Sequence, residues 1–255
     1  MRTLDLNADL GEGFGCWRIG DDAAMLDIVS TANIACGAHA GDPQIMRDTI
    51  STARHLGVAV GAHPGYADLA GFGRRAMLGV TASEIENLVA YQIGAFVGLA
   101  ALAGHPPTHV KTHGALGNAC AIDDDLADAV ARAIRAVDAG LAFMVMPGMA
   151  TARAADRAGL KPIHEIYADR TYAPNFNLTP RDRPEAMIHG ADAALARIIE
   201  VLETKVITAT DGSVLPVEID SICVHGDSVG AVEMATKLRK GLEAKGYVIA
   251  SGVTG

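Results

Sequence analysis

Short apolar runs alternate along this chain with longer segments in which an apolar residue recurs every three or four positions. Short runs bounded by turn residues predict strands, and the longer period predicts amphipathic helices. The predicted strands are residues 2–9, 31–36, 58–63, 109–113, 141–146, 162–168, 218–225 and 247–250. The predicted helices are residues 43–56, 81–103, 124–139, 149–158, 184–203 and 228–245. Two helix starts carry cap signals, Asp42 before a proline and a capping box at Thr81.

Strand and helix alternate without a linker that would separate two cores, so residues 1–255 are expected to form a single domain. Such alternation predicts parallel strands covered by helices. A closed (β/α) barrel of about 250 residues would use the whole chain, and an open doubly wound sheet is the alternative. Two segments lie outside the alternation. Residues 169–183 are a candidate lid, and Asp211-Gly212 predicts a hairpin turn within residues 208–217.

Composition narrows the class of protein. The 255 residues are 50% hydrophobic, with 21 Lys and Arg against 30 Asp and Glu, and no stretch concentrates basic residues. A nucleic-acid partner is therefore not expected. The sequence has no uninterrupted apolar stretch long enough to predict a membrane span. The four cysteines are widely spaced and form no C-x-x-C. We expect a protein of the reduced cytoplasm, with no membrane contact.

Uncommon polar residues gather at the ends of the predicted strands. In a barrel the carboxyl ends of the strands converge on one face, where active sites of this architecture are built. Asp5, Asn7 and Asp9 alternate with apolar residues, so the polar set can point into the barrel while the apolar set meets the helices. The alternative is that these groups are caps and turn residues. The expected site draws on Asn7, Asp9, His39, His63, Lys111, His113, Asp169, Arg170, His225 and Asp227.

One familiar motif suggests a different class of enzyme, and another is absent from the sequence. Residues 226–230 read G-D-S-V-G, which matches the G-x-S-x-G of a nucleophile elbow. In that fold the triad histidine follows the serine, whereas His225 is the last histidine here, so Ser228 is expected to be a helix N-cap. The sequence contains no G-x-x-x-x-G-K-[ST], which excludes a P-loop as the means of holding ATP.

The histidines raise the question of a metal. His109 and His113 have the spacing of a helical metal pair, but on a strand four residues separate them by roughly 13 Å, too far for shared coordination. Lys111 adds a positive charge that opposes a cation. We therefore expect no tightly bound metal. A mixed site of Asp9, His39, His63 and His225 stays open as an alternative.

Motifs distributed over the whole chain resemble the LamB/YcsF family. They are DLNADLGEGFG at residues 5–15, ANIACGAHAGDP at 32–43, HPGYAD at 63–68, VKTHGALGN at 110–118, EIYADRTY at 165–172, LTPR at 178–181 and VHGD at 224–227. The chain departs from the usual family pattern at Ala38, Thr112 and Gly117, where Phe, Pro and Tyr are usual.

The resemblance implies an irregular barrel of about seven parallel strands, similar to the glycoside hydrolase/deacetylase barrel. It implies the A subunit of an ATP-hydrolysing 5-oxoprolinase, which opens 5-oxo-L-proline to L-glutamate together with subunits B and C. ATP, accompanied by Mg²⁺, would be the co-substrate. A self-sufficient metal-dependent deacetylase or amidohydrolase, and a non-catalytic binding or scaffold subunit, are the alternatives.

Hypothetical roles can be assigned to the residues. Lys111 and Arg170 would stabilise charge on a phosphorylated or tetrahedral oxygen. Asp9 or Asp227 would activate water, and His113 or His225, with Asp169 among the catalytic set, would protonate the leaving nitrogen. The residues expected to bind substrate are Asn7, Glu12, His39, Asp42, His63, Asn118 and Arg181.

Overall fold

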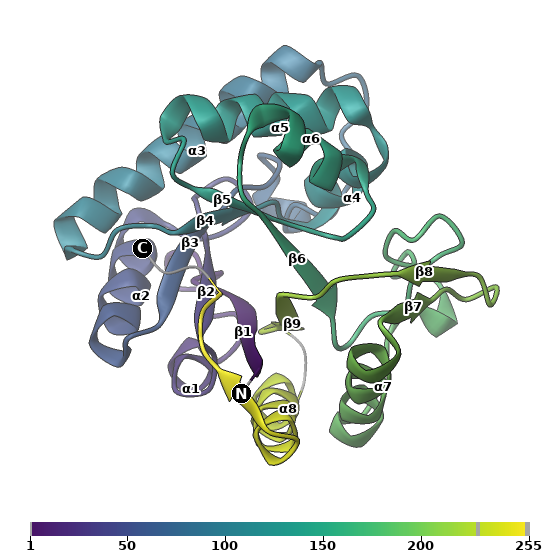
Figure 1. Ribbon diagram of the computed structural model, residues 1–255. Helices are drawn as coiled ribbons and strands as arrows, with labels where there is room; N and C mark the ends of the chain where they lie inside the picture. Colours follow the sequence, from purple (N-terminus) through teal and green to yellow (C-terminus); the bar gives the residue numbers. More distant parts are fainter. Residues whose placement is uncertain (1, 228–229, 253–255) are drawn as a thin grey trace.

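Seven parallel strands form a closed barrel in the computed structural model, which describes residues 2–227 and 230–252 (Figure 1). The barrel strands are β1 (Arg2–Leu10), β2 (Thr31–Ala35), β3 (Ala59–His63), β4 (His109–Lys111), β5 (Ala142–Val145), β6 (Pro162–Tyr167) and β9 (Ser221–His225). Strand β1 pairs with β2 on one side and with β9 on the other, which closes the sheet. The predicted barrel is confirmed, and this closure excludes the open sheet.

Helices surround the barrel and cover the outer face of its strands (Figure 1). They are α1 (Asp22–Leu26), α2 (Pro43–Leu56), α3 (Ala82–Ala103), α4 (Gly114–Ile122), α5 (Asp124–Val137), α6 (Ala150–Ala158), α7 (Ala191–Thr204) and α8 (Ala231–Ala244), with 3-10 turns η1 (Leu69–Gly71) and η2 (Pro184–Ala186). The two predicted caps are present. Asp42 accepts from the backbone of Gln44 and Ile45, and Thr81 forms a reciprocal capping box with Glu84.

Several predicted boundaries were wrong. The helix predicted over residues 184–203 is a 3-10 turn followed by α7, which begins only after Gly190, a residue with a φ of 89°. Helix α4 was not predicted, since residues 114–122 are small and apolar on all sides and lack amphipathic spacing. The predicted cap at Ser228 lies outside the described residues, and Gly230 is at the N-cap of α8.

Three short strands complete the structure. Strands β7 (Val206–Thr208) and β8 (Val214–Pro216) form the predicted antiparallel hairpin, beside α7 in Figure 1. Strand β10 (Tyr247–Ile249) pairs with the first residues of β1 and does not enter the barrel. The candidate lid, residues 169–183, is anchored by the buried Tyr172, whose hydroxyl accepts a hydrogen bond from the backbone N–H of Tyr167.

Helix α3 is long and apolar enough to cross a membrane by length and composition alone. It packs against α2 and α5, and its buried residues include Ile85, Val89, Ile93 and Phe96. A core helix of a soluble protein has the same character, so this feature is weak evidence for a membrane span.

The alternation in β1 sorts apolar from polar side chains as predicted. Leu4, Leu6 and Ala8 are buried in the hydrophobic core beneath the helices. Asp5, Asn7 and Asp9 are equally buried, but their hydrogen-bond partners come from other strands of the barrel. The barrel interior is therefore polar, and its polar groups need partners from neighbouring strands to offset the cost of burial.

We predict that Gly41→Ala destabilises the fold by about 2–5 kcal/mol. Gly41 has a φ of 79°, and a Cβ there would lie 2.7 Å from the carbonyl oxygen of Ala35 and 2.8 Å from that of Gly11. The control is Gly98→Ala on helix α3, where the added methyl group meets no heavy atom within 4 Å. We expect it to raise the free energy of unfolding by about 0.5–1 kcal/mol. Urea unfolding of both variants measures the difference, and equal stabilities would contradict it.

Candidate active site

A buried lysine lies at the centre of the carboxyl end of the barrel. Lys111 Nζ, from β4, is 2.9 Å from Asp9 Oδ1 on β1 and 2.8 Å from Glu165 Oε1 on β6. Burial alone lowers the pKa of Lys111, but the charges of Asp9, Cys223 and Glu165 outweigh it and raise the pKa well above its usual value. Burial raises the pKa of Asp9, yet the adjacent His63 and Lys111 bring it well below its usual value. The result is a charged ion pair inside the protein.

A hydrogen-bond network deeper in the barrel holds this ion pair. Asn7 donates to Glu165 Oε1 at 2.9 Å and to Ser221 Oγ at 2.7 Å, and its own Oδ1 accepts from Asn33 at 2.8 Å. Asn33 also donates to Asp9 Oδ1 at 2.9 Å. Asn7, an expected substrate-binding residue, therefore positions the charged groups from below.

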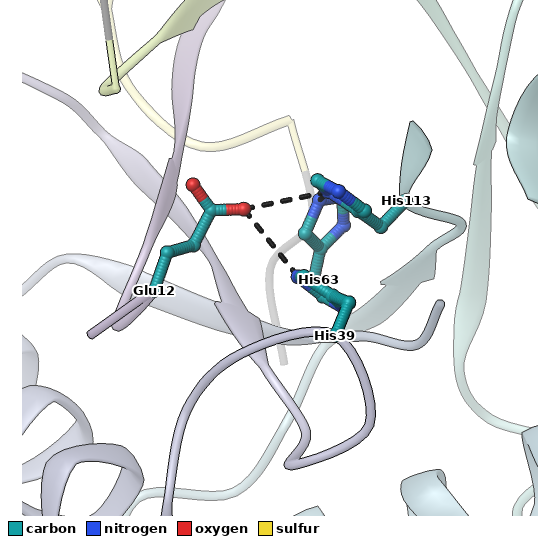
Figure 2. A group of neighbouring side chains, drawn as sticks. All are labelled: Glu12, His39, His63 and His113. Carbon is teal, nitrogen blue, oxygen red and sulfur yellow. Dashed lines mark hydrogen bonds and ion pairs between the residues drawn. The ribbon is translucent and has the colours of Figure 1, made fainter. Parts of the chain in front are cut away.

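Four side chains beside the ion pair form a second cluster, which we call the histidine cluster: Glu12, His39, His63 and His113 (Figure 2). Glu12 Oε1 is 3.4 Å from His39 Nε2 and 3.4 Å from His113 Nδ1. His63 Nε2 is 3.0 Å from His113 Nδ1. Burial, followed by the charge of Asp9, raises the pKa of Glu12 well above its usual value.

A third group pairs an aspartate with a histidine from two neighbouring strands, β6 and β9. His225, at the end of β9, lies with its Nδ1 2.9 Å from both carboxylate oxygens of Asp169, after β6. Burial raises the pKa of Asp169, but His225 and Arg170 outweigh burial, and the pKa falls below its usual value. The ring of Tyr167 stacks on His225 at 5.3 Å. An ionised Asp169 that accepts from Nδ1–H fixes the tautomer of the neutral ring, in which Nε2 carries the lone pair.

Arginines stand around the opening of the site. Arg74 Nη2 is 2.7 Å from Asp227 Oδ2. Arg170 donates to the carbonyl oxygens of Thr179 and Ala186, and burial, followed by Arg181, lowers the pKa of Arg170 to about 10. These cations give the opening a preference for an anionic ligand.

A cavity of about 260 Å³ connects the three groups. The expected site residues that line it are Asp9, His63, Lys111, His113, Asn118, Arg170, Arg181 and His225. The other expected residues support those in the lining. Asn7, Glu12 and His39 lie behind it, Asp169 orients His225, Asp227 pairs with Arg74, and Asp42 caps α2 and accepts from the backbone of Gly15.

The cavity lining also includes Glu165, Tyr167 and Arg74, which were not among the site residues expected from the sequence. Glu165, Tyr167 and Asp169 alternate along β6 and its extension, the parity that identified Asp5, Asn7 and Asp9 on β1. Applying the same test to β6 would have found the first two. Arg74 follows a 3-10 turn in a long connection, and no local pattern marks it.

Replacing Lys111 tests the buried ion pair. Lys111→Met leaves Asp9 and Glu165 buried without their cation, and we predict a loss of about 3–5 kcal/mol in the free energy of unfolding. The control is Lys245→Met, which breaks the half-exposed pair with Glu203 and is expected to change stability by about 1 kcal/mol or less. Chemical denaturation measures both. Equal losses would mean that Lys111 is not compensating buried charge.

Comparison with known proteins finds relatives that match nearly the whole chain. The A subunit of 5-oxoprolinase from Rhodopseudomonas palustris is 51% identical over 97% of both chains. The crystal structure of the lactam utilization protein from Thermus thermophilus superposes with a TM-score of 0.90, at 38% identity over 98% of this chain and 99% of that one. A polysaccharide deacetylase from Bacillus cereus, at 18% identity and a TM-score of 0.50 over 98% and 92% of the chains, shares the fold alone.

The family model described as LamB/YcsF matches residues 4–254, which is nearly the whole chain. The motifs that suggested the resemblance lie within that match, and several of their polar residues meet around the cavity. The chain belongs to the LamB/YcsF family.

Proposed function

We propose that this chain is the A subunit of an ATP-dependent 5-oxoprolinase. The observation that carries the proposal is the cavity floored by the Asp9–Lys111 ion pair, in a chain about half identical to proteins named as the A subunit of 5-oxoprolinase. In the overall reaction water adds to the carbonyl carbon of 5-oxo-L-proline, the ring C–N bond breaks and the nitrogen takes up a proton. The product is L-glutamate, and a second water molecule is consumed as ATP becomes ADP and phosphate.

The cavity suits the lactam better than the nucleotide. Its volume of about 260 Å³ is below the roughly 300–1,000 Å³ of pockets that hold drug-sized ligands. The sequence contains no P-loop. We therefore assign the lactam to this cavity and the binding of ATP and its Mg²⁺ to a partner subunit or to the interface with one. Dependence on partners B and C, and a cytoplasmic location, are parts of the same proposal.

Lys111 and Asp9 act on the carbonyl end of the lactam. An amide carbonyl is a poor electrophile, and phosphorylation of its oxygen by ATP would make the carbon reactive. The fixed ammonium of Lys111 stabilises negative charge on that oxygen without reorganisation, because Asp9 and Glu165 already hold it in place. Asp9 stays ionised and accepts a proton from the attacking water. Asp227, the other candidate base, pairs with Arg74 and does not itself line the cavity, so we give the role to Asp9.

His225 acts on the nitrogen end. Asp169 accepts from its Nδ1–H, fixes the ring and stabilises its imidazolium form, whose Nε2–H supplies the proton to the leaving nitrogen. His113, the other candidate acid, donates through Nε2 to the carbonyl of Phe72 and has its second nitrogen in the histidine cluster. Arg181 on the cavity wall provides a charge partner for the substrate carboxylate.

We predict that His225→Gln lowers kcat for ATP-dependent glutamate release about 100-fold or more and leaves KM for 5-oxo-L-proline nearly unchanged. The reason is that proton transfer contributes to the transition state and not to ground-state binding. The assay uses the chain reconstituted with subunits B and C, and measures glutamate and ADP together.

The control is His164→Gln, a partly exposed histidine on the same sheet that pairs with Asp220 and does not line the cavity. Its activity is expected to equal that of the unmodified chain. Full activity in His225→Gln would overturn the assignment of the acid. Glutamate release without ATP or partners would instead support a self-sufficient hydrolase.

A further inference from the structure

The histidine cluster brings together four potential metal ligands, and the proposed reaction does not use them as such. Its four side chains come from different segments, since Glu12 follows β1, His39 follows β2, His63 ends β3 and His113 follows β4. All four are buried, and one nitrogen or oxygen of each lies within 4.8 Å of those of the others. Figure 2 shows them pointing toward one common point.

Two of the histidines present bare lone pairs to this point. His63 Nδ1 is 2.8 Å from the carbonyl oxygen of Lys111, and His113 Nε2 is 2.8 Å from that of Phe72. A carbonyl oxygen only accepts, so both of these nitrogens carry hydrogen. In the neutral rings, His63 Nε2 and His113 Nδ1 are therefore both acceptors, yet they lie 3.0 Å apart beside a carboxylate oxygen. Both nitrogens and the carboxylate oxygen therefore present lone pairs to one point, where a cation would bind.

The remaining two members have buried polar atoms without hydrogen-bond partners. Within the described part of the chain, Glu12 Oε1 and both ring nitrogens of His39 are buried without a hydrogen bond. Each unsatisfied buried group costs about 1–3 kcal/mol, so a protein keeps them only where something else binds them.

We propose that Glu12, His39, His63 and His113 bind one divalent transition-metal ion of the zinc class. Imidazole nitrogen and carboxylate oxygen are ligands that zinc takes in tetrahedral sites, at bonds of about 2.0–2.2 Å. Such bonds place neighbouring ligand atoms about 3.3–3.6 Å apart. Three of the six separations in the cluster are 3.0, 3.4 and 3.4 Å, and all six are within 4.8 Å. A bound ion of this kind polarises a carbonyl or lowers the pKa of a bound water.

The stacked rings indicate which ligand moves when the ion binds. His39 and His113 are parallel, with centroids 3.7 Å apart and planes at 2°, so one ring must tilt for both to point at the same ion. His113 is held by the carbonyl of Phe72, whereas His39 has no hydrogen bond of its own within the described residues. His39 is therefore the ring that turns.

The charge of Lys111 does not oppose this ion. The sequence led us to expect repulsion, but Lys111 lies between Asp9 and Glu165, and both carboxylates are within 2.9 Å of its Nζ. Asp9 Oδ2 is also 3.4 Å from His63 Nε2, which adds negative charge next to the site. His63 and His113 line the cavity as well, so the ion would be accessible to a ligand bound there.

Metal titration of the full chain tests the proposal directly. The protein is stripped with a chelator and titrated with Zn²⁺ alone by calorimetry, and with Co²⁺ while the visible spectrum is recorded. We expect one ion per chain and the intense absorption of tetrahedral Co²⁺. His113→Gln and Glu12→Gln are each expected to weaken Zn²⁺ binding at least tenfold. His164→Gln, a histidine outside the cluster, is expected to leave it unchanged.

Circular dichroism and thermal unfolding establish that each variant is folded, and His39→Gln provides a third ligand variant if one of the others does not fold. A chain that takes up no Zn²⁺, or one whose uptake is as strong in the folded ligand variants as in His164→Gln, would overturn the proposal. Because the readout is metal binding and not glutamate release, this result is separate from the outcome for the proposed reaction.

Discussion

The buried ammonium of Lys111 is the interaction on which the rest of the site depends. Asp9 and Glu165 belong to strands on opposite sides of β4 in the barrel, and their carboxylates would repel each other in a medium of low dielectric constant. Lys111 lies between them and attracts both. Removing it would leave two buried carboxylates without their cation, which a protein interior tolerates poorly. The ion pair thus links the stability of the barrel to the chemistry of its cavity.

Each reactive group around the cavity is held by a second group that does not touch the ligand. Asn7 and Asn33 fix the carboxylates from below, Asp169 fixes His225, and the backbone carbonyl of Lys111 fixes His63. Such support keeps charges and lone pairs in position before the ligand arrives, which is the condition for electrostatic catalysis.

The barrel followed from the sequence because alternating strand and helix patterns leave few topologies, and strand parity identified Asp5, Asn7 and Asp9 as inward-facing. His109, which the strand spacing separates from His113, is not part of the histidine cluster, and its Nε2 bonds to Asn33. Contacts between side chains that are distant in the sequence could not be derived from the sequence. His113 meets His63 and Glu12 only because β1, β3 and β4 end at the same face of the barrel, and Arg74 comes from a connection without a pattern.

The most direct test of the account is a crystal structure of the chain with 5-oxo-L-proline. The account predicts the lactam in the cavity, with its carbonyl oxygen next to Lys111 Nζ, its nitrogen toward His225 and its carboxylate toward Arg181. A lactam bound elsewhere on the chain, or a nucleotide that displaces it from this cavity, would contradict the central claim.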